Sequence, residues 1–149
     1  MNKHIITTAL IAVIAFAAQA ATPEQEKAFV ESYKKALVAK DTAALKAFLH
    51  TGGANAETIE FFSMMQETAA GKPGVSVELV TPTKEEMAKF NKPMEMPDGK
   101  KYKLPFAPTK QLVVTIEEKD GDSVSKSTSK SPVGEKNGKL VIPVPVPAK

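Results

Sequence analysis

The residues of this chain that could do chemistry are thinly spread along it. His50 is the one histidine that follows the N-terminal segment. As a general base or a metal ligand it would need a partner, but no second histidine or acidic cluster stands near it in the sequence. A basic group is also stabilising at the C-terminus of a helix. We therefore interpret His50 as a helix-terminal residue, with catalysis or ligand contact as the alternative.

Acidic and sulfur-containing side chains offer two partial metal-binding patterns. Asp98, Asp120 and Asp122 stand beside glycines, a pairing that favours tight turns. The last two begin like a calcium-binding loop, but the spaced oxygen ligands and the distal glutamate of such a loop are missing. Met94 and Met96 are a closely spaced thioether pair of the kind that suits Cu(I). Turn formation explains the aspartates, and we expect neither a bound metal nor a cofactor.

Composition excludes further classes of chemistry. The chain contains no cysteine, which excludes disulfides, thiol catalysis, thiolate metal sites and a cysteine-linked lipid anchor. Its serines lack the G-x-S-x-G context of a hydrolase nucleophile. The chain has no arginine, so it lacks the planar fork that binds phosphate at two points. The formal net charge of +3 reflects a small excess of lysine. We predict no nucleic-acid binding and assign no catalytic residue.

The first 20 residues have the layout of a secretory signal peptide. A short start containing Lys3 is followed by an almost wholly apolar run at residues 5–17. That run is too short for a comfortable membrane span of ~20 residues. Ala18-Gln19-Ala20 fits the small-x-small cleavage rule, and Ala21 becomes the mature N-terminus. An N-terminal anchor or a buried helix is the alternative. We expect residues 21–149 to form one exported domain, periplasmic or secreted, without stable membrane insertion after cleavage.

Capping residues and apolar spacing predict three helices in the first half of this domain. Thr22 is an N-cap with Gln25 as its capping-box partner, and this helix ends near residue 39. Asp41 caps a second, shorter helix, which the Thr-Gly-Gly run at 51–53 stops. A third helix begins at residue 55 or 56. The residues expected to be buried together, from these helices and from the later sheet, are Phe29, Tyr33, Leu37, Leu45, Phe48, Phe62, Val114 and Ile116.

The C-terminal third predicts an antiparallel meander. Residues 111–116 are rich in β-branched side chains, and alternate residues share one apolar face. Glycine-containing turns at 119–122 and 135–138 separate this strand from two more. The stretch from 123 to 131 is polar and alternates in period two. We expect an exposed or edge strand there, with Lys126 and Lys130 discouraging edge-to-edge pairing.

The remaining segments are short or rich in proline. Residues 75–79 alternate like a half-buried strand, and Thr83 with Glu86 forms a second capping box for a short helix. Within the proline-rich stretch 91–109, the Pro-Asp-Gly run at 97–99 is expected to turn residues 94–96 back against 102–104. The Pro-Val-Pro-Val-Pro tail is predicted to be extended, near polyproline II, without regular ladder hydrogen bonds.

The order of these elements resembles the nuclear transport factor 2-like (cystatin-like) superfamily. Lys40-Asp41-Thr42-Ala43-Ala44-Leu45 is similar to that family's corner between its first two helices. Glu135-Lys136-Asn137-Gly138-Lys139-Leu140 is similar to its late hairpin, with Leu140 where the family usually has an aromatic residue. No strand is predicted between the second and third helices. The resemblance implies an α+β fold in which three N-terminal helices pack on a curved antiparallel sheet. The resulting cone holds a pocket at its open end in some members.

Three functional classes fit this prediction. The first, which we favour, is a non-catalytic exported module that binds a small ligand or an envelope protein at the mouth of the cone or on the face of the sheet. The second is a small lyase-, isomerase- or hydrolase-like enzyme with a carboxylate or Tyr33 inside the cone. The third is a structural envelope protein that acts through its exposed sheet. The residues proposed to line a ligand pocket are Tyr33, His50, Phe62 and Met65.

Overall fold

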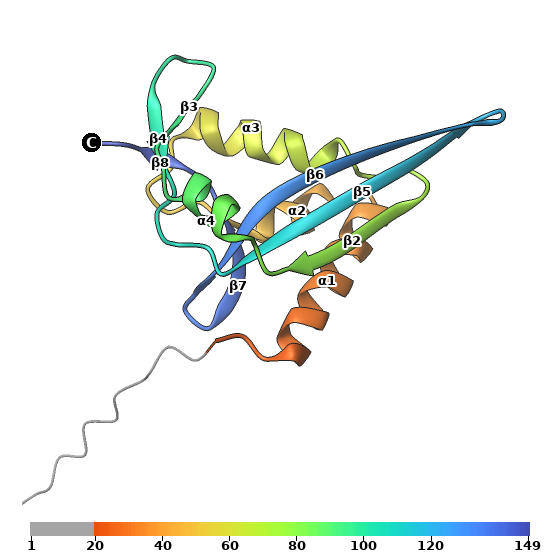
Figure 1. Cartoon of the computed structure of the whole chain (residues 1–149), viewed down its shortest axis with the longest axis horizontal. Coiled ribbons are helices and arrows are strands. Elements are labelled where there is room, and N and C mark those ends of the chain that lie inside the picture. Colours follow the sequence, from red (N-terminus) through yellow and green to blue (C-terminus); the bar gives the residue numbers. More distant parts are fainter. Residues whose placement is uncertain (1–19) are drawn as a thin grey trace, which may run out of the picture.

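The computed structural model of the chain describes residues 20–149, which form four helices and eight strands in two sheets (Figure 1). This confirms the α+β class. The predicted signal segment lies outside the described residues, apart from its last residue. The helices are α1 (Pro23–Val38), α2 (Thr42–Ala47), α3 (Ala56–Glu67) and α4 (Lys84–Phe90). The strands are β1 (Leu49–His50), β2 (Val75–Val80), β3 (Met94–Glu95), β4 (Lys101–Lys103), β5 (Lys110–Asp120), β6 (Ser123–Lys136), β7 (Lys139–Pro143) and β8 (Val146–Pro147).

Side-chain caps start the helices at the predicted residues. Thr22 and Gln25 form both bonds of a capping box at the start of α1. Asp41 caps α2 and Asn55 caps α3, and each accepts a hydrogen bond from a backbone N–H of the first turn. Thr83 begins α4 with a second capping box. Each cap satisfies an N–H group that the first turn of a helix leaves without a partner.

The predicted meander forms the centre of a five-stranded sheet in the order β1-β7-β6-β5-β2. Gly121 and Asp122 connect β5 to β6, and Gly121 has a φ of +60°. Asn137 and Gly138 connect β6 to β7, with φ values of +52° and +74°. Both are two-residue hairpin turns whose backbone matches the twist of the strands. Because β2 pairs only with residues 111–116 of β5, the far ends of β5 and β6 project as a two-stranded arm (Figure 1).

A second sheet of three strands, β3-β4-β8, forms from the two proline-rich segments. The hairpin predicted around Pro97-Asp98-Gly99 is present, and Met94 pairs with Tyr102 in it. Its turn closes with hydrogen bonds from the N–H of Met96 to the carbonyl of Lys100 and from Gly99 to Met96. The proline-rich excursion is therefore an ordered strand pair.

Two segments differ from the sequence expectation. Strand β1 lies between the second and third helices, where no strand was expected, and Leu49 pairs in parallel with Ile142 of β7. The C-terminal tail does make ladder hydrogen bonds. The N–H of Val144 donates to the carbonyl of His50 over 3.0 Å, and β8 pairs with β4. The valines between the prolines keep their N–H groups, and burial requires those groups to be paired.

The core lies between α1, α2 and the inner face of the larger sheet. All eight residues predicted to be buried belong to it, although Phe48, Phe62 and Ile116 are only partly covered. Phe29, Tyr33 and Phe48 form an aromatic cluster, with the Tyr33 and Phe48 ring centroids 5.1 Å apart in an edge-to-face arrangement. This geometry is the one that aromatic quadrupoles favour.

Candidate binding site

Strand β6 is hydrogen-bonded on one side only over most of its length. It pairs with β5 from Ser123 to Val133, whereas β7 pairs with it only from Gly134 to Lys136. Because a two-residue turn closes with a hydrogen-bonded pair, the pair of Ser123 with Asp120 exchanges both bonds. Bonded pairs then recur at every second residue. The even-numbered residues from 124 to 132 therefore direct their backbone groups away from β5.

Pro132 fits this alternation. Its missing N–H falls on the outward side of the strand, so the ladder with β5 loses no bond there. The outward N–H groups belong to Val124, Lys126, Thr128 and Lys130, and no backbone hydrogen bond satisfies them within residues 20–149. This part of β6 is the open edge of the sheet, which agrees with the exposed or edge strand predicted from its sequence.

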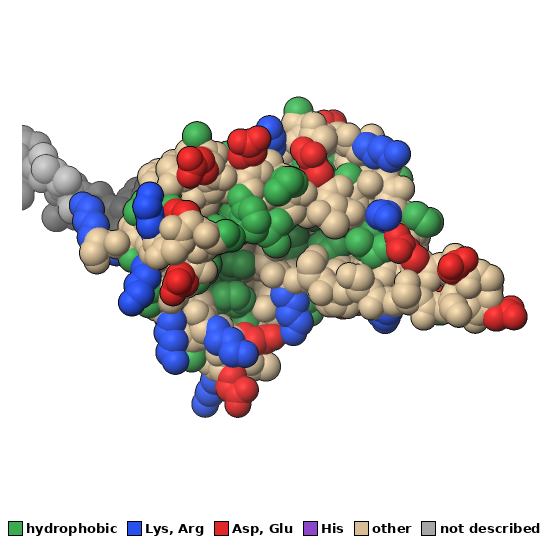
Figure 2. Space-filling view, turned by 90° about the horizontal axis from the view of Figure 1, so that it is seen from above, with side chains coloured by type: hydrophobic (Ala, Val, Ile, Leu, Met, Phe, Trp, Pro, Cys, Tyr) green, Lys and Arg blue, Asp and Glu red, His purple; other side chains and the backbone are tan. Residues whose placement is uncertain are grey.

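An apolar hollow adjoins the open edge. In Figure 1, α3 lies above β6, on the side toward which that edge faces. Figure 2 shows hydrophobic side chains gathered in a depression at the centre of one face, between α3 and the arm. Ile59 and Phe62 of α3 and Ile116 of β5 pack against the core but remain partly exposed. Ser127 and Ser129 lie on the same face of the sheet as Ile116, and both are exposed.

Helix α3 leaves much of its apolar surface exposed. Met64 and Met65 are 59% and 52% exposed. The apolar residues of α3 run almost all round the helix, and α3 packs on α2 along one flank. Thr58 and Ser63 are the residues that it buries instead.

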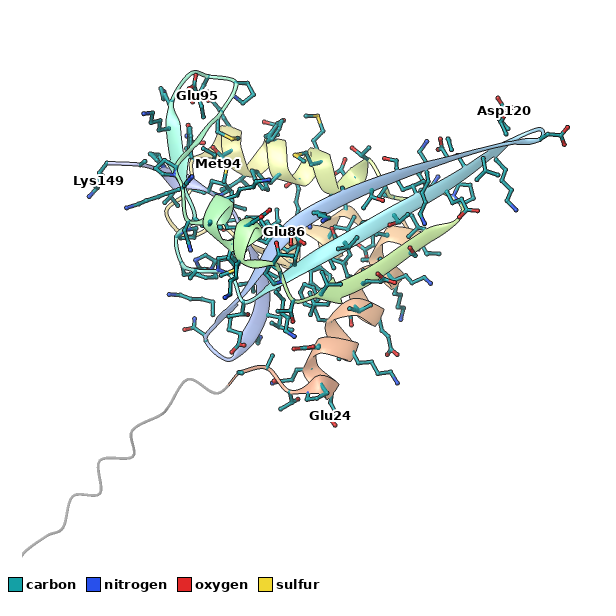
Figure 3. The ribbon with its side chains drawn as sticks, viewed as in Figure 1. Glu24, Glu86, Met94, Glu95, Asp120 and Lys149 are labelled. Atoms are coloured by element: carbon teal, nitrogen blue, oxygen red, sulfur yellow. The ribbon has the colours of Figure 1, made fainter. Side chains whose placement is uncertain are left out.

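An ion pair fixes helix α4 beside the same strand. Nζ of Lys130 lies 2.7 Å from Oε1 of Glu86. Figure 3 shows the position of Glu86 on α4. Glu86 also accepts the N–H of Thr83 over 2.9 Å and so completes the capping box. The hydrogen bond from Lys130 and that from Thr83 lower the pKa of Glu86 from its usual 4.5 to about 2. The carboxylate is therefore ionised at neutral pH, and it ties α4 to β6.

A cleft of about 150 Å³ lies between α3 and the β3–β4 hairpin. Tyr102 lines it but is only 2% exposed. Its hydroxyl donates to Oδ2 of Asp98 over 2.7 Å and accepts from Nδ2 of Asn55 over 3.1 Å. The backbone N–H of Lys100 and this hydroxyl hold the pKa of Asp98 below its usual value. These polar groups already bond one another, so the network joins the hairpin to the start of α3.

Of the predicted pocket residues, Tyr33 lies in the core and is 3% exposed. Burial raises the pKa of Tyr33, and the neighbouring side chain of Gln66 partly offsets that rise. Nε2 of Gln66 donates to the carbonyl of Leu45, and its Oε1 has no partner among the described residues. Tyr33 is therefore a buried member of the aromatic cluster, whereas Phe62 of α3 is only partly covered and Met65 is exposed.

His50 occupies a strand and not a helix terminus. Helix α2 ends at Ala47, and His50 is the second residue of β1. Its ring meets that of Phe106 edge-on, with centroids 5.2 Å apart. The interpretation of His50 as a helix-terminal basic group is wrong, because the chain turns into a parallel pairing with β7 that local sequence does not encode. No group of three or more His, Cys, Asp or Glu residues that could hold a metal forms within the described range.

Sequence reasoning missed two features of this region. Tyr102 drew no attention, although it is the single apolar residue in a Lys-Tyr-Lys strand after a turn. The hollow depends on how far α3 stands from β6, and no local pattern reports that distance.

None of the helices in residues 20–149 is long and apolar enough to cross a membrane. The chain matches no protein-family model, and no curated protein or solved structure matches it.

Proposed function

We propose that the protein is a non-catalytic exported module, periplasmic or secreted, that binds a small ligand or an envelope protein in the hollow between α3 and β6. The observations that carry the proposal are the apolar depression between α3 and the arm (Figure 2) and the exposure of Met64 and Met65 on α3. On monomeric soluble proteins, contiguous exposed apolar patches larger than a few hundred Å² are rare and mark interaction sites. The hollow combines apolar walls with few polar groups, which is the usual composition of a binding site.

The proposed cone architecture supports this placement. In the nuclear transport factor 2-like arrangement, three N-terminal helices pack on a curved sheet and the open end of the cone receives the ligand. The sequence features behind this resemblance begin α2 and form the turn between β6 and β7. In this proposal, α3 and the open edge of β6 frame the mouth of the cone.

An enzyme of the lyase or isomerase type is the alternative, and it needs an ionisable group that faces a solvent-connected cavity. Tyr33 was the candidate, but it is buried among aromatic rings and burial raises its pKa. Tyr102 and Asp98 face a cleft but bond each other. A structural envelope protein acting through its exposed sheet is the third class, and it makes no use of the hollow.

A charge placed in the hollow tests the proposal. The Ser129→Asp variant puts a carboxylate on the sheet face that borders the hollow, whereas Thr128→Asp puts the same charge on the opposite face of the same strand. An uncharged naphthylamine dye should bind the mature protein saturably. We expect Ser129→Asp to weaken that binding about tenfold and Thr128→Asp to leave it unchanged. Absence of saturable binding, or equal effects of the two variants, would remove the hollow as the site.

The export part of the proposal has its own test. Protein recovered from the envelope fraction should begin at Ala21 on N-terminal sequencing, because cleavage follows Ala18-Gln19-Ala20. Recovery of a cytoplasmic product that begins at Met1 would contradict export and leave the binding test unaffected.

A further inference from the structure

We infer that the occupant of the hollow is an extended segment of another protein, which adds to the sheet as a strand beside β6. This inference rests on the proposed function and names the class of partner. The outward N–H groups of Val124, Lys126, Thr128 and Lys130 alternate with the bonded residues at the spacing that a neighbouring strand requires. Strand addition to such an edge takes its affinity from backbone hydrogen bonds and its specificity from alternate side chains.

The available edge has defined ends. At one end, Gly134 pairs with Val141, so β7 already occupies the position beside β6. At the other end lies the hairpin turn at Gly121 and Asp122. An added strand continues the line of β7 along β6 from Pro132 to Val124. Since β7 runs antiparallel to β6 and antiparallel ladders are slightly more stable per residue, the added strand runs antiparallel too.

The register sets the pattern of side chains in the partner. Partner residues opposite Lys126, Thr128 and Lys130 share the outer face of the sheet, where Lys130 bonds Glu86 and Lys126 stands opposite Glu117. These positions suit polar side chains, because charges of both signs already balance there. Partner residues opposite the odd-numbered serines direct their side chains into the apolar hollow. The partner is therefore an amphipathic strand with an apolar residue at every second position.

In the register centred on Thr128, a second copy of the chain fits this edge poorly. If two β6 strands paired about a two-fold axis at Thr128, Lys126 of each copy would stand opposite Lys130 of the other. Like charges directly opposite one another in a ladder are destabilising, and lysines on an open edge commonly prevent edge-to-edge pairing. The same lysines allow β6 to pair with a strand of a different protein, provided that this strand has no cation opposite Lys126 or Lys130.

The probe is a synthetic octapeptide of alternating threonine and valine, titrated into the mature protein. The threonines direct their N–H groups toward β6 when the valines enter the hollow. N-methylation of the threonines removes these donors, and we expect it to abolish measurable binding. N-methylation of the valines changes only the N–H groups that face away from β6, and it should leave affinity within about threefold. Equal binding of the two methylated peptides would show apolar docking without a ladder, which overturns strand addition and leaves the proposed function standing.

Proline substitution tests the protein side of the ladder. Thr128→Pro removes an outward N–H without breaking a bond to β5, as Pro132 does naturally. We expect it to weaken peptide binding at least tenfold while the midpoint of thermal unfolding stays close to that of Thr128→Ala. The alanine variant is the control, because both lose the contact between the Thr128 and Thr115 hydroxyls. Unchanged peptide affinity in Thr128→Pro would overturn the inference. The inference would also fail if the free protein were a dimer and Thr128→Pro converted it to a monomer.

Discussion

The hydroxyl of Tyr102 donates a hydrogen bond to Oδ2 of Asp98 over 2.7 Å, and this bond joins strand β4 to the turn of the β3–β4 hairpin. The same hydroxyl accepts from Asn55, the residue that caps α3. One buried oxygen thus links the hairpin to a helix that lies 47 residues earlier in the chain. Tyr102 and Asp98 both line the cleft between α3 and the hairpin.

Tyr102→Phe should therefore destabilise the protein although it removes a single oxygen. It deprives the partly buried amide of Asn55 of its acceptor, and a typical intramolecular hydrogen bond contributes about 0.5–1.5 kcal/mol. Asp98 is exposed to water, which replaces the donor that Asp98 loses. Urea denaturation of both proteins measures the difference. A change below about 0.5 kcal/mol would show that water replaces the hydroxyl without loss.

The loss of stability on truncating a core side chain should increase with the burial of that side chain. Leu112 is 1% exposed, and Leu112→Ala should lower the free energy of unfolding by about 2–5 kcal/mol through lost transfer energy and a residual cavity. Ile116 borders the hollow and is only partly covered, so Ile116→Ala should cost clearly less. Val124→Ala, on the exposed arm, is the control and should stay within about 0.5 kcal/mol. An equal cost for Leu112 and Ile116 would contradict an open hollow.

The sequence predicts the elements that are determined by residues close to one another in the chain. Thr22, Asp41 and Asn55 cap helices through groups three residues away, so short-range patterns suffice. Alternating apolar residues and glycine turns place β5, β6 and β7 for the same reason.

What sequence does not predict depends on distant partners. His50 joins a strand because β7, nearly a hundred residues later, offers it a parallel edge. Val144 finds its acceptor there too. Met65 is exposed because α3 is covered along one flank only, and periodicity does not identify the covered flank when apolar residues occur all round.

Acid should weaken the ion pair between Glu86 of α4 and Lys130 of β6. The folded state lowers the pKa of Glu86 from 4.5 to about 2, so the ion pair with Lys130 stabilises the protein above pH 4.5. As the pH falls from about 4.5 toward 2, the unfolded chain binds a proton first and this contribution is lost. Glu86→Gln should reduce the slope of stability against pH in that window, measured by urea denaturation. Glu85→Gln, on the same turn of α4 and outside the pair, serves as the control. Equal slopes for Glu86→Gln and the unchanged protein would show that the pair does not contribute.

High pH should destabilise the protein through ionisation of Tyr33 in the aromatic cluster. Burial raises the pKa of Tyr33 above its usual 10.0, so the unfolded chain loses the phenol proton at lower pH than the folded protein does. Stability from this group is complete below pH 10 and declines as the pH rises beyond it. Tyr33→Phe should remove that part of the decline, whereas lysine titration remains in both proteins. Identical stability profiles above pH 10 would place the hydroxyl of Tyr33 in contact with water. Unchanged dye binding by this variant would also separate Tyr33 from the hollow.

The N–H of Ala21 donates to Oε1 of Glu135 over 2.8 Å, next to the start of α1. Cleavage after Ala20 would convert this amide into a charged ammonium and the hydrogen bond into an ion pair. Such a cation lies close to the positive end of the α1 dipole, and Glu135 offsets that repulsion. We predict that Glu135→Gln costs more stability in a chain that begins at Ala21 than in one that begins at Ala20.

A double-mutant cycle measures this coupling. The two N-termini differ by one alanine, so the cycle isolates the charge that faces Glu135. We expect a coupling of about 0.5–1 kcal/mol, because the pair is only partly shielded from water. High salt should reduce it, since ions screen exposed pairs. An equal cost of Glu135→Gln in both chains would show that the mature N-terminus does not use this carboxylate.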